Sequence, residues 1–433
     1  MQSFIDKFQS AVSGELGLTL AFLLLGALTA QVLLLLLSSL RRSFYEREQH
    51  RLSRQRLQLQ VKAAMSQSRE AEQIKMLWNG YRKFRVARKV LECADVYSFY
   101  LSPHDGKPLP AFKPGQYLTF QLDLPGRDKP LIRCYSLSDC ASRPEYYRVT
   151  IKRAAAPPDK PDLLPGLAST FFSDHVREGE ILNVKAPGGN FFLDMGKPTP
   201  VVLISGGVGI TPMLSMANAI IESGDKREVW FFFGARNRGE HIQKEHLEKL
   251  AAANDNFHLH ICYSKPAPDD QLDRDYQHAE RVSVELFKKL LPSNNFDYFI
   301  CGPGAFMKSI TDGLEAWGVP DANVFFEAFG PATVKKAAPV VPAVESSAPS
   351  LQITFSRTGK VCAWKPTLGS LLDLADEHGI KIDSGCRAGN CGTCLVAIKS
   401  GAVDYVTEHG ADAESGSCLT CICKPRSNLV LDA

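Results

Sequence analysis

The sequence predicts a multidomain protein with one N-terminal transmembrane helix, an antiparallel β-barrel, an α/β domain and a small C-terminal domain. Three observations support this prediction. Residues 16–40 contain no charged side chain, short β-type segments separated by turns fill 82–195, and apolar strands alternate with amphipathic helices over 196–331. The 433 residues are enough for about three domains.

The composition indicates globular material and narrows the choice of partners. Charged residues make up 22% of the chain and hydrophobic residues 45%, while the net charge of +3 is too small to indicate nucleic-acid binding. Of the 12 cysteines, half are scattered and half lie close to the C-terminus. This distribution is typical of a reducing compartment, in which clustered cysteines more often bind metal than form disulfides.

The first 81 residues predict a membrane anchor followed by a stalk. Residues 16–40 exceed the length of about 20 residues that crosses a bilayer, and residues 1–15 would form a short non-cytoplasmic N-terminus. The alternative is a cleaved signal peptide, but no basic segment precedes the apolar run. Arg41, Arg42 and further arginines follow it directly, which places the later domains in the cytoplasm. We therefore expect a single-pass protein of the inner (cytoplasmic) membrane, with a helical stalk over 41–81.

Residues 82–195 predict the β-barrel, and two segments in it suit a phosphate-bearing aromatic ligand. In "RCYSLS", 133–138, Arg133 can hold a phosphate while Tyr135 lies on an aromatic ring. In "GLASTFF" a helix begins near Gly166, with Ser169 and Thr170 in its first turn. Backbone amides at a helix start, helped by hydroxyl groups, form an anion site. By itself "RCYSLS" is equally well an ordinary strand.

Residues 196–331 predict a parallel sheet with a nucleotide site at one edge. "LISGGVGITPM" places Gly206, Gly207 and Gly209 between a buried strand and a helix, where a backbone can approach a pyrophosphate closely. The glycines do not form the full dinucleotide fingerprint, so alone they are weak evidence. "CGPGAFM" places Cys301 at the carboxyl edge of the sheet, although a buried small hydrophobe explains this cysteine equally well. "FFEAFG" then ends the domain.

A linker over 332–350 leads to a small domain, 351–433, that contains a cysteine cluster. Cys386, Cys391 and Cys394 have the spacing C-x4-C-x2-C, which is the plant-type [2Fe–2S] pattern and requires a distant fourth cysteine. Zinc fits this spacing poorly because its sites normally use two comparable pairs. The candidates for the fourth ligand are Cys418, Cys421 and Cys423.

The order "RCYSLS", "GLAST", "GGVGITPM", "CGPGAFM" and "FFEAFGP" resembles the ferredoxin–NADP reductase superfamily, and in particular the reductase part of flavohaemoglobins. Residues from 351 onward resemble plant-type ferredoxins, which have the β-grasp fold. Those ferredoxins place a proline four positions after the last cluster ligand. Cys421 and Pro425 match this register, so the resemblance favours Cys421 as the fourth ligand.

The resemblance implies FAD, a nicotinamide nucleotide and a [2Fe–2S] cluster, with residues in three groups. The catalytic residues would be Cys301, Glu327 and Thr211. The flavin would be bound by Arg133, Tyr135, Ser136, Ser138, Gly166, Ser169, Thr170 and Phe329, and the nicotinamide nucleotide by Gly206, Gly207, Gly209, Gly302 and Pro303. FMN is a minor alternative to FAD. NADH is expected, with NADPH as the alternative because Arg236 and Arg238 can bind a 2′-phosphate.

These cofactors imply a reductase that takes electrons from NADH and passes them singly to another protein. We expect that acceptor to be a membrane-associated oxygenase, hydroxylase or desaturase. The alternative is the electron-input subunit of a membrane NADH–quinone reductase, but there the ferredoxin part precedes the flavin part. A redox-sensing tether is a third hypothesis, which the complete set of redox motifs disfavours.

Overall fold

The computed structural model describes two compact units, Met1–Lys75 and Met76–Ala433. In the first unit the described residues are 5, 22–42, 45, 49, 51–54, 56–57 and 60–61. In the second they are 76–127, 130–141, 143, 145–155, 165–329, 351–385, 387, 389, 392–406, 413 and 415–433. The predicted N-terminal segment 1–15, the linker 332–350, and the predicted ligands Cys386 and Cys391 lie largely or wholly outside the described residues.

The first unit contains a helix over Phe22–Arg42 that is long and apolar enough to cross a membrane, with a mean hydropathy of 2.2. Its leucines are exposed. Thr29 and Ser38 donate their hydroxyl hydrogens to the carbonyls of Gly26 and Leu35, at 2.9 and 2.8 Å. These bonds satisfy both hydroxyl groups within the helix itself. A signal sequence near the N-terminus can also be this long and apolar.

Six strands form the antiparallel barrel, in the order β4-β3-β6-β1-β2-β5. They are β1 (Arg82–Cys93), β2 (Val96–Pro103), β3 (Tyr117–Leu122), β4 (Leu131–Ser136), β5 (Tyr147–Lys152) and β6 (Ile181–Val184), with helix α2 (Leu167–Asp174) between β5 and β6. A bridge between Leu137 and Val149 brings the two ends of this sheet together. Phe172 of α2 packs edge-on against Phe99 and Phe120 inside the barrel. The predicted barrel is confirmed.

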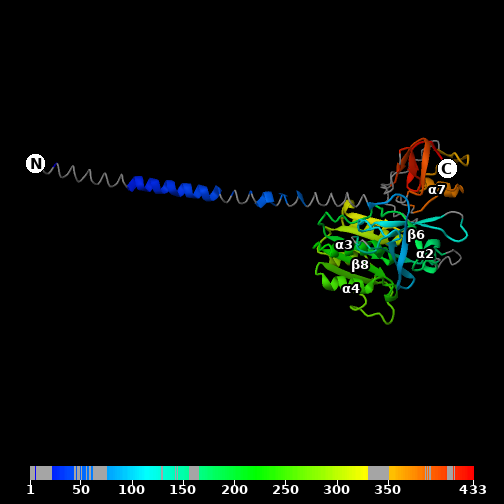
Figure 1. Ribbon diagram of the computed structural model, residues 1–433, viewed down its shortest axis with the longest axis horizontal. Coiled ribbons are helices and arrows are strands. Elements are labelled where there is room, and N and C mark those ends of the chain that lie inside the picture. The colour runs from blue at the N-terminus through cyan, green and yellow to red at the C-terminus, as the bar shows by residue number, and fades with distance from the viewer. Residues whose placement is uncertain are drawn as a thin grey trace. The chain divides into compact units, whose positions relative to one another are not determined.

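The next domain contains a parallel five-stranded sheet in the order β11-β10-β7-β8-β9. Figure 1 labels β8 of this sheet together with helices α3 and α4. Its strands are β7 (Val201–Gly206), β8 (Val229–Ala235), β9 (Phe257–Tyr263), β10 (Asp297–Gly302) and β11 (Val324–Ala328). Its helices are α3 (Ile210–Glu222), α4 (Lys244–Ala253), α5 (Val284–Leu290) and α6 (Gly304–Ala316), with short 3-10 turns η1 (Gly207–Gly209), η2 (Arg238–Glu240) and η3 (Asp321–Asn323).

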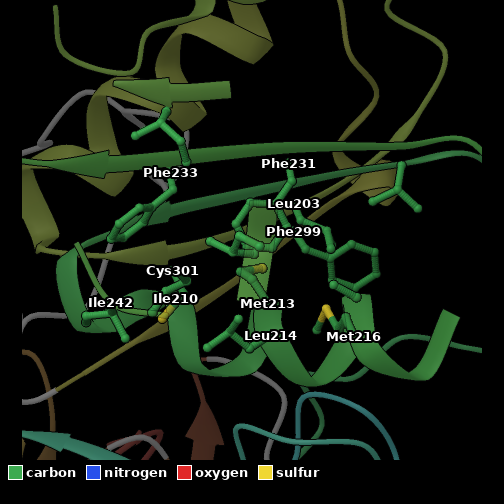
Figure 2. Close-up of a cluster of buried hydrophobic side chains, with 14 of the residues drawn as sticks. Leu203, Ile210, Met213, Leu214, Met216, Phe231, Phe233, Ile242, Phe299 and Cys301 are labelled. Carbon is green, nitrogen blue, oxygen red and sulfur yellow. The ribbon is translucent and has the colours of Figure 1, made fainter. Parts of the chain in front are cut away.

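Helices cover both faces of this sheet. Leu203 on β7 belongs to a core cluster with residues of α3 and α4, whereas its neighbour Ile204 belongs to a second cluster with residues of α5 and α6. Successive strand residues point to opposite faces, so the two clusters lie on opposite sides of the sheet. Figure 2 shows the first cluster, in which Phe231 and Phe299 from two further strands contribute aromatic rings. The predicted α/β domain is confirmed.

The C-terminal domain is a mixed sheet packed against one helix. Its strands are β12 (Gln352–Phe355), β13 (Lys360–Ala363), β14 (Leu395–Ser400), β15 (Val403–Tyr405), β16 (Ser417–Leu419), β17 (Cys423–Pro425) and β18 (Leu429–Leu431), and its helix is α7 (Leu371–Glu377). The main sheet has the order β13-β12-β18-β14-β16, and β12 and β18 run parallel. Ile353, Phe355 and Leu431 share a core with Leu371 and Leu374 of α7. This arrangement agrees with the expected β-grasp fold.

Gly115 lies where the barrel meets helix α3, and the space there admits no side chain. Its φ of +110° is in the region that favours glycine. A Cβ atom at this position would lie 2.6 Å from the Met216 Cε atom and 2.6 Å from the Phe191 carbonyl oxygen. Only glycine therefore fits at this position, between the Phe191 backbone and the end of the Met216 side chain of α3.

Replacing Gly115 by alanine should therefore destabilise the protein more than the same change at Gly106. Gly106 also has a positive φ, of +68°, but nothing lies within 4 Å of the added Cβ. We expect Gly106→Ala to cost about 1–2 kcal/mol from backbone strain alone, and Gly115→Ala roughly 2–4 kcal/mol because overpacking is added. Urea unfolding followed by tryptophan fluorescence measures both losses. Equal losses would contradict the close contact.

Candidate functional site

The register of three parallel strands brings Cys301 and Glu327 together. Cys301 is the penultimate residue of β10. It pairs with Ser205 on β7 and with Glu327 on β11. These positions lie at the carboxyl edge of the sheet, where open α/β sheets bind ligands. Cys301 is fully buried, and Figure 2 shows its side chain near Ile210 at the start of α3. Two predicted site residues thus lie side by side on neighbouring strands.

A hydrogen bond connects this edge to the barrel. Ser136, the last residue of β4, donates from its Oγ to the Oε2 of Glu327 at 3.1 Å. Ser136 is buried, and it belongs to the segment 133–138 in which the sequence predicts a cofactor site. The barrel segment and the carboxyl edge of the sheet therefore form one continuous site.

Burial keeps both titratable groups at this edge protonated. The residue Glu327 is only partly buried as a whole, but the burial of its carboxyl group raises its pKa to about 8, with the Ser136 hydrogen bond acting in the opposite direction. Burial also raises the pKa of the Cys301 thiol well above its ordinary value, and the neighbouring Glu327 adds to this effect. At neutral pH this edge of the sheet therefore holds a carboxylic acid and a thiol, and both are uncharged.

The glycine-rich turn after β7 is held against the turn after β10. Gly207 has a φ of +56°. A Cβ atom on Gly209 would lie 2.3 Å from the carbonyl oxygen of Cys301. Helix α3 then begins without a side-chain cap, because its N-cap residue is Gly209. The Thr211 hydroxyl, in the first turn, donates to the Val208 carbonyl at 3.1 Å. The uncapped helix start and the partly buried glycine turn before it suit an anionic ligand.

Gly302 and Pro303 lie beside this turn. A Cβ atom on Gly302 would lie 3.2 Å from the backbone nitrogen of Gly206 and 2.7 Å from a ring carbon of Phe306. Pro303 precedes α6 as its N-cap residue, and no side chain caps that helix. The structure therefore brings the two predicted nucleotide-binding turns together at one edge.

On the barrel side, Tyr135 is enclosed by aromatic rings. Its ring packs edge-on against Phe120 and Phe172, with centroid distances of 5.8 and 5.2 Å. Burial raises the pKa of its phenol well above the ordinary value. Arg133, two residues earlier on β4, is half-buried and donates to the Ile132 carbonyl at 2.7 Å. Both side chains come from the strand that ends at Ser136.

The start of α2 combines an uncapped helix end with an unsatisfied hydroxyl. Gly166, the N-cap residue, offers no side-chain cap. The Oγ of Ser169 accepts from the Ala154 amide and donates to the Gly166 carbonyl, both at 3.0 Å, so it already has two partners. The Oγ1 of Thr170 is buried and has no hydrogen-bond partner among the described residues. A phosphate at this helix start would satisfy that hydroxyl, so the residues fit a phosphate-bearing cofactor.

The structure places two other predicted cofactor residues in different surroundings. Ser138 is fully buried, and its hydroxyl contacts the Thr150 Oγ1 at 2.8 Å and the Arg148 Nε at 3.2 Å. Its hydroxyl is therefore occupied by protein partners, and its role as a cofactor ligand stays a prediction. Phe329 follows β11 directly and is 40% exposed, so its ring is available to a ligand.

Sequence reasoning missed the partners of the arginines after β8. Arg238 forms an ion pair with Asp269 at 2.9 Å and lies 3.9 Å from Asp270, and its amide donates to Asp270. Arg236 lies 3.5 Å from Glu240. The adjacent acidic residues in "PAPDDQ" were a visible signal, but their pairing with a loop some 30 residues away was not.

In the C-terminal domain the three candidates for the fourth ligand occupy different places. The Sγ atoms of Cys394 and Cys421 lie 3.1 Å apart. Cys418 and Cys423 are fully buried in the main core of the domain, whereas Cys394 and Cys421 belong to a separate small cluster. Two sulfur atoms in contact suit a common metal centre. Among the described residues no group of three potential ligands gathers, and two predicted ligands are outside that set.

Comparisons with known proteins assign two parts of the chain. The family model of the oxidoreductase NAD-binding domain matches residues 203–312, and that of the 2Fe-2S iron-sulfur cluster binding domain matches residues 353–426. A flavohemoprotein of Halalkalibacterium halodurans is 40% identical over 263 residues. That match covers 61% of this chain and 63% of the relative, so the chain spans less than two thirds of this curated protein.

Two solved structures are also similar. The flavohem-like FAD/NAD-binding domain of nitric oxide dioxygenase from Vibrio cholerae is 32% identical, with a TM-score of 0.51, over 58% of this chain and 100% of that one. Phthalate dioxygenase reductase, described as a modular structure for electron transfer from pyridine nucleotides to [2Fe-2S], is 26% identical with a TM-score of 0.50. That match covers 82% of this chain and 98% of the reductase, so it includes the C-terminal domain as well.

The position of Cys421 predicts the effect of replacing it. Cys421→Ser should lose most of the bound iron and visible absorption of the C-terminal domain, because its sulfur lies beside that of Cys394. The matched control is Cys423→Ser, since Cys423 faces the core and should leave the iron content unchanged. Iron analysis and absorption spectra of both purified variants test this. Full iron content in Cys421→Ser would contradict the assignment.

The raised pKa of Glu327 predicts a pH-dependent stability. The folded protein favours the uncharged acid up to pH of about 8, whereas a free glutamate ionises near 4.5. The contribution of Glu327 to the free energy of unfolding is therefore fully present below pH 4.5 and is lost as the pH rises through 8. Glu327→Gln cannot ionise, so the wild type should lose melting temperature relative to this variant over that window. Thermal unfolding of both proteins without bound flavin measures the difference, and parallel curves would contradict it.

Proposed function

Because the chain belongs to the family of reductases with a flavohaemoprotein-like FAD/NAD-binding domain, here joined to a 2Fe-2S domain, we propose that it supplies electrons from NADH to an oxygenase-type partner. The chain is an NAD(P)H-dependent oxidoreductase whose cofactors are FAD, NAD(H) and a [2Fe–2S] cluster. The identity of the partner and the membrane attachment are parts of the proposal.

The order of the domains carries this proposal. The 2Fe-2S domain follows the NAD-binding domain, and phthalate dioxygenase reductase matches across both, over 98% of its length. This supports an oxygenase, hydroxylase or desaturase as the acceptor more than a quinone. When bound, the flavin can accept a hydride, with both electrons of the broken C–H bond, and release the electrons one at a time to the cluster.

The barrel residues support specific roles toward the flavin. We assign Tyr135 and Arg133 to the flavin ring and its phosphate, and the start of α2, with Gly166, Ser169 and Thr170, to the pyrophosphate. The unsatisfied Thr170 hydroxyl supports the pyrophosphate site. Ser169 would contribute its backbone amide, since its hydroxyl already has two protein partners.

The residues of the sheet edge support roles toward the nicotinamide nucleotide. We assign Gly206, Gly207 and Gly209, with Gly302 and Pro303, to its phosphates and ribose. Thr211 would stabilise the turn through its bond to Val208.

Cys301 and Glu327 would line the place of hydride transfer. Ser136 orients Glu327, and the two protonated groups keep the pocket uncharged and dry. The exposed ring of Phe329 would cover the flavin.

The surroundings of Arg238 support NADH over NADPH. A 2′-phosphate needs a cation that is free to pair with it. Arg238 is already paired with Asp269 and lies beside Asp270, so a phosphate there would approach two carboxylates. Arg236 is exposed, but it lies near Glu240. The 2′-hydroxyl group of NADH brings no charge and avoids this repulsion.

The helix Phe22–Arg42 supports a membrane-attached form of this reductase. Arg41 and Arg42 are the last two residues of this range, and further arginines follow in the sequence. By the positive-inside rule this flank stays in the cytoplasm, together with the catalytic domains. We propose a single-pass protein of the inner (cytoplasmic) membrane that concentrates electrons near a membrane-associated partner.

Electron transfer to two acceptors tests the proposed route. The detergent-solubilised wild type should reduce ferricyanide, which can take electrons at the flavin, and cytochrome c, which would take them from the cluster. Cys421→Ser should keep most of its ferricyanide activity and lose at least 10-fold in cytochrome c activity, with NADH preferred to NADPH in both assays. Equal losses toward both acceptors would contradict a route through the cluster. Faster reduction of a quinone than of either acceptor would favour the respiratory alternative.

A further inference from the structure

A buried chain of hydrogen bonds crosses the boundary between the barrel and the α/β domain. Asn218 of α3 donates from its Nδ2 to the Oδ1 of Asp139 at 3.3 Å. The Oδ1 of Asn218 faces the Nε2 of His246, on α4, at 2.7 Å. Asp139 directly follows the segment 133–138, and α3 begins at the glycine-rich turn. These hydrogen bonds form a link of Asp139, Asn218 and His246, and this link joins the two halves of the candidate site.

The barrel end of this link is held firmly. Asp139 is 8% exposed and Asn218 is 2% exposed. The carboxylate of Asp139 also accepts from the Tyr146 hydroxyl at 2.9 Å and lies 3.6 Å from the Arg148 guanidinium. A buried carboxylate is tolerated only when its partners satisfy it, so these contacts fix one orientation.

The donors and acceptors of the link are consistent with one another. Because the amide nitrogen of Asn218 donates to Asp139, its oxygen must accept from His246, whose Nε2 therefore carries a hydrogen. Burial lowers the pKa of His246, and the nearby Arg148 acts in the same direction. The ring is thus neutral, with its hydrogen on the nitrogen that faces Asn218.

The link acts on the start of α3 through a rigid helix. Asn218 lies eight residues after Ile210, which is about 12 Å along an α-helix. Met216 of the same helix packs at Gly115 of the barrel, where no side chain fits. Fixing α3 at these points also fixes the distance from its N-terminal turn to the barrel strand that ends at Ser136.

We propose that Asp139, Asn218 and His246 are positioning residues for hydride transfer, which set the separation of the nicotinamide and flavin sites. This inference rests on the proposed function. In the reaction the C–H bond of the dihydronicotinamide breaks, an N–H bond forms on the flavin, and both electrons move with the hydrogen, which leaves NAD⁺. A displacement of about 1 Å can slow such a step about 100-fold. Loosening the link should therefore slow hydride transfer while leaving each binding site intact.

The test uses the full chain with its flavin and compares three variants of the link and one control variant with the wild type. Asn218→Ala removes the centre of the link. His246→Gln keeps an N–H donor that can reach Asn218, whereas His246→Ala does not. Glu222→Gln is the control, because it removes the exposed 2.5 Å ion pair with Arg143, one turn further along α3, and leaves the hydrogen bonds of Asn218 in place. Arg143 also lies 3.8 Å from Asp139, so this control includes the electrostatic surroundings of the link.

Three measurements separate positioning from general damage. Anaerobic rapid mixing with saturating NADH gives the limiting rate of flavin reduction. Equilibrium titration with NAD⁺ gives the affinity of the nucleotide site. Amide hydrogen exchange on flavin-free protein reports the mobility of residues 139–141 and of α3, without any reaction.

We expect Asn218→Ala and His246→Ala to reduce flavin 10- to 100-fold more slowly, with NAD⁺ affinity changed less than 3-fold and faster amide exchange on both sides of the boundary. Glu222→Gln should reduce flavin as fast as the wild type, and His246→Gln should retain most of the wild-type rate of flavin reduction. Unchanged rates in both alanine variants would overturn the proposal, as would a loss confined to NAD⁺ affinity. If Asn218→Ala fails to fold, the rates of flavin reduction in His246→Ala and His246→Gln test the proposal. A wild type that NADH does not reduce would instead refute the proposed function.

Discussion

The hydrogen bond from Ser136 to Glu327 joins two domains at the place where their separate chemistries would meet. Ser136 ends a barrel strand, and Glu327 pairs in register with Cys301 at the carboxyl edge of the sheet. The barrel alone offers aromatic rings and an uncapped helix start, and the sheet alone offers glycine-rich turns. Only their fixed contact makes one site from both, and the close packing at Gly115 allows that contact.

The buried side chains of this site are uncharged, which suits the transfer of a hydride. Glu327 and Cys301 keep their protons because burial makes ionisation unfavourable. Uncharged, buried groups beside the two cofactors would limit competing proton transfer. The electrons would then leave through the C-terminal domain, where the sulfur atoms of Cys394 and Cys421 lie in contact.

The local sequence pattern was sufficient for the domains and for the place of Cys301 at the carboxyl edge of the sheet. Glu327 was expected near Cys301 only through the resemblance to the reductase family, and the strand register places the two residues side by side. The pattern was insufficient for side chains whose partners lie far away in the chain. The Ser138 hydroxyl is occupied by Thr150 and Arg148, and the link from Asn218 reaches a carboxylate 79 positions away. Such partners depend on how domains pack, which periodicity does not encode.

The order in which the cofactors are reduced tests the central claim most directly. The full chain, loaded with FAD and iron and kept anaerobic, is mixed with one equivalent of NADH and frozen at intervals for electron paramagnetic resonance, with absorption recorded in parallel. The flavin absorption should bleach first, and the signal of a reduced [2Fe–2S] cluster should then appear as the flavin is reoxidised. A cluster that stays oxidised, or one that is reduced equally fast in flavin-free protein, would contradict the account.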